Sequence, residues 1–499
     1  MALRTIALLT MARRGTMPPQ SASSGSGDSA NIASASSAEP ATEQPLDLRA
    51  YWLLVLMGAG LLTPWNVVLN ALPFFIGLYS VSGGPGGSPA SSYPFLVSSV
   101  YSWPAVPVLF AMVFFGDRVS LRTRIVGSFA AQAAIMALTP VVAPWSSYAP
   151  LALMFLNGLC TGLLQSSLFG LCAPFPPIYA QGMMLGQGFA GALSSYAQIA
   201  VLAAAAAAPG RSNAATAAYA YFATAAAVMV ACGAAYLALV RLPSAQRYLR
   251  GAGSGGGGGG AALVLVDDSA EGASGEAAAE AGVELLRAGA RDGAGAEDGD
   301  EGGEGGSGSK RPLLSGGSGG GGGVDTAQSG VFAVLRAMWP QALALFLVFF
   351  MTFLVFPGLT IAIPYHGSNA ALAATGNWGI GMLAVFNTFD TVGRFLPGRV
   401  LFLRPSWLLP ASLLRFALVP LFLACVRGWA PAALFGADAF SVALVAVFAA
   451  GNGYVASSVF MLTPPLVRER DQERAGFLLS LLLNLGITLG AQAALVFTA

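Results

Sequence analysis

The stretch FNTFDTVGR, residues 386–394, places one amide and two charged side chains inside an apolar run from about Trp378 to Phe402. Asn387, Asp390 and Arg394 follow one another at spacings that put them on one face of a helix. A charged side chain at membrane depth costs roughly 3 kcal/mol or more unless it faces a partner or a wet cavity. The stretch therefore indicates either a buried structural ion pair or a substrate site in a membrane transporter.

The composition favours a membrane protein that crosses the bilayer many times. Of its 499 residues 55% are hydrophobic and 9% are charged, whereas soluble domains carry about 25% charged residues. Many of the acidic residues lie between Asp267 and Glu304, and Asp390 is the only one well inside an apolar span. The arginines are scattered at span ends and are not clustered with aromatic residues, so we expect no nucleic-acid partner.

Metal and catalytic chemistry find little support in the sequence. The four cysteines lie in apolar segments without a CxxC spacing, and His366 is the single histidine. A His/Cys metal site is therefore not expected, and we predict no cofactor. No nucleophile lies beside a candidate base, so we predict no catalytic residues and no enzymatic activity.

Apolar segments of about 20 residues, the length of a membrane-crossing helix, recur along the chain. We predict an all-α polytopic fold with about eleven spans, six before and five after a Gly-rich insert. The predicted spans are 51–79, 94–115, 125–143, 149–172, 183–208, 216–240, 338–363, 378–402, 407–425, 438–462 and 476–498.

Two further segments differ in composition from the spans. Residues 1–48 are rich in Ser and Ala, with Arg4, Arg13 and Arg14 and no acidic residue before Asp28, which is typical of either a targeting peptide or a disordered tail. Residues 244–330 are Gly-rich and acidic, so we expect a disordered loop. The membrane part is then divided into a six-helix bundle, 49–243, and a five-helix bundle, 331–499. Arginines near alternate span ends predict a cytoplasmic N-terminus.

Several residues within the spans break the usual rules for lipid-facing helices. Pro64 cannot donate to a backbone carbonyl, so we expect a kink in the first span, and Pro357 repeats this feature in the seventh. Trp65 beside Asn66 indicates either a surface that faces inward or a tryptophan that only packs. Gln165 offers a donor and an acceptor, which suits a nucleobase edge or a bond between helices.

Other positions indicate helix packing or gating. The segment GMMLGQGFAG, residues 182–191, contains Gly186 and Gly191 and predicts close helix packing, or a smooth face along which one helix moves against another. Arg415 lies near the centre of the ninth span with no acid on its own helix. We expect it to bond to carbonyls or polar groups of other helices.

Taken in order, these motifs resemble those of the equilibrative nucleoside transporter family. The resemblance covers nearly the whole membrane part and leaves out the N-terminal tail and the insert. Two positions depart from the family pattern, namely Thr161, where glycine is frequent, and Trp103 before Pro104. The matching stretches are PWN 64–66, LQSSLFG 164–170, GQGFAG 186–191, FNTFDTVGR 386–394, NGY 452–454, AG 475–476 and LG 485–486.

The resemblance implies a fold similar to the major facilitator class, with bundles of six and five helices around a central cavity. It implies that Trp65 and Gln165 contact the base of a nucleoside and that Asp390 and Arg394 bind its ribose hydroxyls. The remaining positions would line the cavity: Leu62, Leu69, Phe356, Asn387 and Ile487.

The leading hypothesis is facilitative transport of nucleosides, with nucleobases as a further substrate class, by alternating access. A neighbouring cation favours the charged form of Asp390, which favours passive over proton-coupled transport. The alternatives are a carrier of another polar solute such as a sugar, a membrane protein that kept the fold without transport, and a membrane-embedded enzyme. We expect a monomer in a lipid bilayer, at the plasma membrane or, as the alternative, in an organelle.

Overall fold

A computed structural model describes residues 46–81, 93–207, 214–254, 330–373 and 377–494. The N-terminal tail up to residue 45 and most of the Gly-rich insert, residues 255–329, lie outside the described residues. The predictions made for these two segments therefore stay predictions. The described helices belong to one compact unit, Asp47–Ala499.

The long helices follow the order of the predicted spans. Each predicted span overlaps a described helix or a pair of helices, although α18 is described only to Ala493. In chain order they are α2 (Leu48–Val81), α3 (Tyr93–Phe115), α4 (Leu121–Val142), α5 (Tyr148–Cys172), α6 (Pro177–Ala207), α7 (Ala214–Arg241), α10 (Val331–Val355), α11 (Gly358–Ala362), α13 (Asn377–Phe395), α14 (Leu408–Leu414), α15 (Val419–Arg427), α17 (Asp438–Leu462) and α18 (Gln472–Ala493). The described residues also form the short helices α8 (Pro243–Ser254), α12 (Ala370–Ala373) and α16 (Ala432–Phe435).

Eight of the described segments are long and apolar enough to cross a membrane. They cover all or most of α2, α4, α5, α7, α10 with α11, α14 with α15, α17 and α18. The predicted spans that contain α3, α6 and α13 fall short of this measure; in α13 the charged Asp390 and Arg394 lower the mean hydropathy. The protein is thus an integral membrane protein, and eleven spans remain the prediction.

Two predicted spans are interrupted where prolines remove backbone donors. The predicted helix at 378–402 is too long, because α13 ends at Phe395 and the 3-10 turn η3 (Leu396–Gly398), with Pro397 in it, follows. The predicted span 338–363 consists of α10 and α11, which are separated at Phe356 and Pro357. In contrast, α2 is assigned as one helix through Pro64, where Thr63 and Asn66 donate to the carbonyls of Ala59 and Leu62 (2.8 and 3.0 Å).

The predicted loop after the sixth span begins as a helix, α8. The Ser244 hydroxyl donates to Asp47 Oδ2 (2.6 Å), and the Tyr179 hydroxyl accepts from the Asp47 backbone N–H (3.1 Å). The hydrogen bond from Ser244 lowers the pKa of Asp47 from its usual value, since it stabilises the carboxylate. Tyr248 of α8 packs its ring near Phe175 and Tyr179. The start of α8 is thereby attached to the first turns of α2 and α6.

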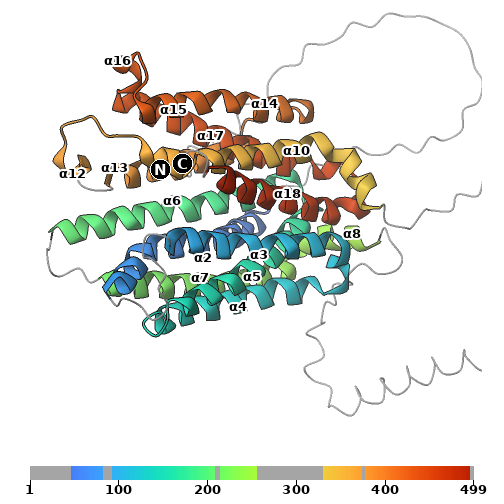
Figure 1. The fold of residues 1–499 in the computed structure, drawn as a ribbon. Coiled ribbons are helices and arrows are strands. Elements are labelled where there is room, and N and C mark those ends of the chain that lie inside the picture. Colours follow the sequence, from blue (N-terminus) through green and yellow to red (C-terminus); the bar gives the residue numbers. More distant parts are fainter. Residues whose placement is uncertain (1–45, 82–92, 208–213, 255–329, 374–376, 495–499) are drawn as a thin grey trace, which may run out of the picture. The chain divides into compact units, whose positions relative to one another are not determined.

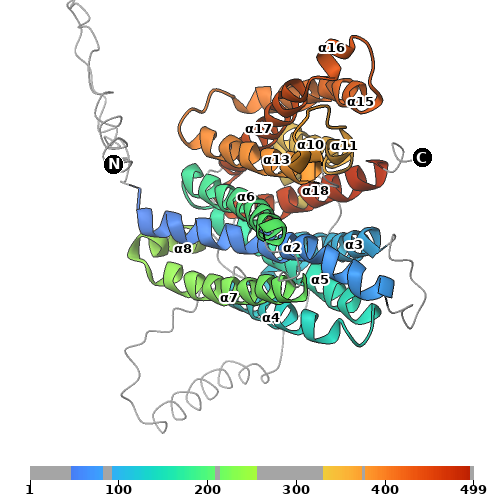
Figure 2. The ribbon, with the colours of Figure 1, turned by 90° about the vertical axis from the view of Figure 1, so that its left-hand side faces the viewer.

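The helices fall into two groups that meet along two seams. Helices α2–α7 pack mainly on one another, and so do α10–α18. One seam joins α6 to α13 and α17, and the other joins α5 and α3 to α18. Both views show α6, in green, at the border with the later helices, in yellow to red (Figure 1, Figure 2).

Aromatic and charged side chains join the two helix groups beside the second seam. Phe169 of α5 stacks on Phe460 of α17 with ring centroids 3.9 Å apart. Arg124 of α4 is almost fully buried and donates to Glu473 Oε1 of α18 (3.1 Å), while its guanidinium lies 5.6 Å from the Phe477 ring centre. The two helix groups are therefore in direct contact at the start of α18.

Glycines allow α13 and α17 to approach closely. A Cβ atom on Gly393 would overlap the backbone carbonyl of Ala450, and one on Gly453 would overlap the carbonyl of Asp390. Gly186 plays the same part between α6 and α2, because a Cβ there would overlap the carbonyl of Val55. The close approach at Gly393 and Gly453 brings the polar residues of α13 against α17.

We predict that Gly393→Ala lowers the thermal stability of the purified protein, by about 1–3 kcal/mol of overpacking strain. Gly381→Ala on the same helix is the matched control, because a Cβ there meets no atom within 4 Å. This control should keep or raise stability, since alanine favours helix. Equal melting temperatures for both variants would contradict the packing described here.

Candidate substrate site

Asp390 and Arg394 form an ion pair on one face of α13. Arg394 Nε donates to Asp390 Oδ2 at 2.7 Å, the length of a strong charge-assisted hydrogen bond. The two residues are 6% and 4% exposed. The i, i+4 spacing on a helix predicts this contact, and the structure has it.

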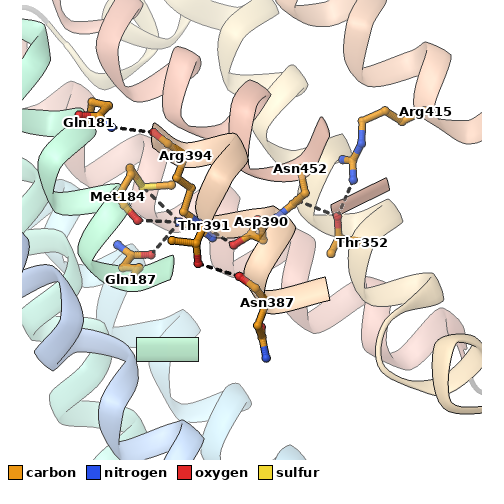
Figure 3. A network of polar contacts seen from close by, with 10 residues as sticks. All are labelled: Gln181, Met184, Gln187, Thr352, Asn387, Asp390, Thr391, Arg394, Arg415 and Asn452. Atoms are coloured by element: carbon orange, nitrogen blue, oxygen red, sulfur yellow. Dashed lines mark hydrogen bonds and ion pairs between the residues drawn. The ribbon is translucent and has the colours of Figure 1, made fainter. Parts of the chain in front are cut away.

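The second oxygen of Asp390 is held from α17. Asn452 Nδ2 donates to Asp390 Oδ1 (2.7 Å), and the Thr352 hydroxyl lies 2.8 Å from Asn452 Oδ1. Arg415 extends the chain, because its Nη2 donates to Thr352 Oγ1 (3.1 Å). Figure 3 shows this chain of contacts from Arg394 to Arg415 through α13, α17 and α10.

Arg415 also bonds to backbone carbonyls. Nη1 donates to the Val348 carbonyl (3.3 Å) and Nη2 to the Phe448 carbonyl (3.1 Å), and the guanidinium lies 4.8 Å from the Phe448 ring centre. Arg415 therefore links α10 and α17 to the 3-10 turn between α14 and α15 in which it lies. A role of Arg415 in gating stays a prediction.

Arg394 reaches across the seam to α6. Its Nη1 lies 3.3 Å from the Met184 carbonyl and 3.5 Å from Gln187 Oε1. Gln181 Nε2 returns a bond to the Arg394 carbonyl (2.8 Å). The ion pair therefore sits at the border of the two helix groups, in contact with both.

Asn387 lies one turn before Asp390 and also faces α6. Its Nδ2 donates to Ser195 Oγ (2.7 Å), and its neighbour Thr388 shares a hydrogen bond with the Tyr196 hydroxyl (2.8 Å). Gly191 leaves room for Asn387, since a Cβ there would lie 2.9 Å from Asn387 Oδ1. The structure thus brings together four of the predicted residues: Gly191, Asn387, Asp390 and Arg394.

Trp65 is half-buried on α2 and one of its faces is covered. The Tyr101 ring of α3 stacks on it at 4.9 Å with an interplanar angle of 25°. The Tyr101 hydroxyl bonds to Thr161 Oγ1 (3.1 Å), which also accepts from Gln132 Nε2 (2.9 Å). Thr161, which stands where the family often has glycine, therefore holds through a hydrogen bond the Tyr101 ring that packs on Trp65.

Gln165 of α5 is buried, and its Nε2 has no hydrogen-bond partner among the described residues. Asn157, two turns earlier on the same helix, has neither amide atom paired in the described part of the protein. Unpaired buried donors are unfavourable unless a ligand or water satisfies them. The Gln165 amide is thus available for a ligand.

The four apolar residues predicted to line the cavity are half-buried. Leu62 and Leu69 share α2 with Trp65, and Ile487 lies on α18 against the core. Phe356 follows α10 and stacks on Phe386 with ring centroids 3.8 Å apart. Trp65, Gln165, Leu62 and Leu69 belong to the first helix group, whereas Phe356 and Ile487 belong to the second with the ion pair.

Sequence reasoning missed three residues around the ion pair, Asn452, Thr352 and Gln187. Asn452 and Gln187 appeared only as letters of family motifs, although each is a polar residue within a predicted span. A polar residue at this depth of a span usually has a partner or a function, and this was the available signal. The partner of each residue depends on which helices are neighbours, and this could not be read from the sequence.

Among the residues described, no group of three or more His, Cys, Asp or Glu lies together. His366 instead bonds through its backbone N–H to Asp438 Oδ1 (3.0 Å), and its Nδ1 lies 3.5 Å from the same oxygen.

Residues 151–499 match the sequence profile of the family described as nucleoside transporter. The chain belongs to the nucleoside transporter family. The rat equilibrative nucleoside transporter 2 is 29% identical over 472 residues, covering 89% of this chain and 95% of the relative. Human equilibrative nucleoside transporter 1 is 26% identical over 504 residues, covering 92% and 99%. The resemblance stated from the motifs is confirmed.

A solved structure supports the fold class. The human organic anion transporter MFSD10 superposes with a TM-score of 0.51 at 15% identity, covering 91% of this chain and 95% of that one. This likeness concerns the fold alone. The prediction of an all-α membrane protein similar to the major facilitator class is confirmed.

We predict that Asn452→Leu lowers the thermal stability by about 2 kcal/mol, because Asp390 Oδ1 loses a buried donor. Asn484→Leu is the control, since the Asn484 amide donates to the Ser480 carbonyl of its own helix (3.0 Å) and not to a charged group. A clearly larger drop in melting temperature for Asn452→Leu is expected. An equal drop would mean that the bond to Asp390 contributes nothing specific.

Proposed function

We propose that this protein carries nucleosides across a membrane by facilitated transport with alternating access. The observation that carries the proposal is the buried Asp390–Arg394 pair, which touches both helix groups of a chain that belongs to the nucleoside transporter family. Relatives along most of the chain are named equilibrative nucleoside transporters. Their names describe transport, in agreement with the expectation that this chain is not an enzyme.

The chemistry of the polar groups suits a nucleoside, which is an uncharged solute with a flat base and several hydroxyls. Asp390 accepts hydrogen bonds from ribose hydroxyls, and Arg394 donates to ribose oxygens while it orients the carboxylate. At the other end of the solute, the free Nε2 of Gln165 donates to an acceptor on the base edge. In this proposal the base stacks on the face of Trp65 opposite Tyr101.

Apolar and amide side chains complete the site in this proposal. Leu62, Leu69 and Ile487 contact the apolar parts of the base, and Phe356 and Asn387 border the sugar. Pro64, Asn66, Gly186 and Pro357 shape the helices that carry them. These roles rest on the positions of the residues on α2, α6, α10, α13 and α18 together with the family motifs.

Alternating access requires contacts between the helix groups that form and break. The first seam holds small residues and single hydrogen bonds, such as Asn387 to Ser195 and Thr388 to Tyr196. Beside the second seam, the Phe169–Phe460 stack and the Arg124–Glu473 pair also join the two groups. We propose that these seams open in turn, while the packing within each group is kept.

The membrane and the assembly state are part of the proposal. The protein acts as a monomer in a lipid bilayer, because one chain supplies both helix groups and the residues of the site between them. We place it at the plasma membrane, with an organellar membrane as the alternative. Transport is passive, since Asp390 already has a cationic partner at 2.7 Å.

We predict that Asp390→Asn lowers the ratio of maximal rate to KM for uridine by about 10- to 100-fold, because hydrogen bonds to a charged acceptor are lost. The measurement is initial uptake into proteoliposomes at matched protein amounts. Asp438→Asn is the control, as this residue pairs with His366 at a helix start. Uptake that is unchanged in Asp390→Asn would contradict the site.

A further inference from the structure

Gln187 on α6 carries a buried hydrogen-bond donor that nothing satisfies in the described part of the protein. Its side chain is 5% exposed, and its Nε2 is buried without a partner. The residue lies beside the ion pair, because Arg394 Nη1 is 3.5 Å from Gln187 Oε1. An unpaired donor next to a proposed sugar site indicates an acceptor on a ligand.

The orientation of the Gln187 amide follows from the chemistry of its neighbour. A guanidinium has only donors, so the group that faces Arg394 must be the amide oxygen. If the amide were rotated by 180°, Gln187 Nε2 would face Arg394 Nη1, and two donors would meet without an acceptor. Figure 3 shows the oxygen of Gln187 toward Arg394 and the nitrogen turned away from it. The free donor is therefore imposed by Arg394.

Gln181 on the same helix shows what a purely structural glutamine looks like here. Its Nε2 donates to the Arg394 carbonyl (2.8 Å), and its Oε1 accepts from the Tyr51 hydroxyl (3.0 Å). Both amide atoms are used, and they tie α6 to α2 and α13. Gln187 is equally buried, but only its oxygen is bonded.

We propose that Gln187 is a substrate-contacting residue whose Nε2 donates to an oxygen of the nucleoside sugar beside Asp390 and Arg394. This inference rests on the proposed function and adds a residue of α6 to the sugar site. The three side chains complement one another, because the carboxylate accepts from hydroxyls whereas the guanidinium and the amide donate to oxygen. Such a set fits a polyhydroxylated ring.

The proposal places sugar contacts on both helix groups. Asp390 and Arg394 belong to α13, whereas Gln187 belongs to α6 on the other side of the seam. A sugar held by all three residues joins the two groups through the substrate. Binding is then linked to the seam that must open during transport.

The test uses Gln187→Met, with Gln181→Met as the matched control in the same helix. Uptake into proteoliposomes is measured for uridine and for analogues that each lack one sugar oxygen: the 2′-deoxy, 3′-deoxy, 5′-deoxy and carbocyclic forms. We expect Gln187→Met to raise the KM for uridine about 3- to 10-fold, the effect of one neutral hydrogen bond. The KM of the analogue that lacks the bonded oxygen should hardly change.

Gln187→Glu is the second variant, because it keeps an acceptor for Arg394 and the size of the side chain but removes the donor. If Gln187→Met folds poorly, Gln187→Glu should still show the same pattern, a raised KM for uridine and an almost unchanged KM for the analogue that lacks the bonded oxygen. Gln181→Met should change the KM values of uridine and its four analogues by one common factor.

The inference is overturned if both Gln187 variants also change the KM values of all five compounds by one common factor. A wild-type protein that takes up none of them in a saturable way would instead refute the proposed function. The two failures are thus distinguishable.

Discussion

The salt bridge from Arg394 to Asp390, 2.7 Å long and almost fully buried, is the interaction on which the rest of the site depends. Charges at membrane depth are expensive unless each has partners. The structure meets this requirement from three directions, with Asn452 on one carboxylate oxygen, Arg394 on the other and the Met184 carbonyl on the arginine. Each partner comes from a different helix, so the pair fixes how α6, α13 and α17 meet.

The position of the pair also explains how binding and motion are connected. The Arg394 guanidinium binds a carboxylate of its own helix and a carbonyl of α6 across the seam. A solute that competes for Arg394 or Asp390 changes contacts within α13 and between the helix groups at once. Glycines on α6, such as Gly191 beside Asn387, keep its surface smooth along the seam. Such an interface can open without disrupting the packing of either group.

The sequence allowed much of this arrangement to be predicted. The spacing of Asp390 and Arg394 predicts their contact, because the geometry of one helix decides it. The order and approximate position of the long helices follow from the length of apolar runs. The end of α13 at Phe395 was missed, since the apolar run continues to Phe402 although Pro397 interrupts the backbone bonding.

Contacts between helices could not be predicted in this way. The bond of Asn452 to Asp390, the stacking of Tyr101 on Trp65 and the free donor of Gln187 all depend on which helices become neighbours.

The central claim, that a nucleoside is carried by a site which faces each side of the membrane in turn, is tested most directly by counterflow. Proteoliposomes without any ion gradient are loaded with unlabelled uridine and diluted into a trace of labelled uridine. A carrier with alternating access should accumulate the label transiently above its external concentration, because internal uridine occupies returning sites and hinders the exit of the label. Label that only rises to the external concentration without an overshoot, or does not enter at all, would contradict the account.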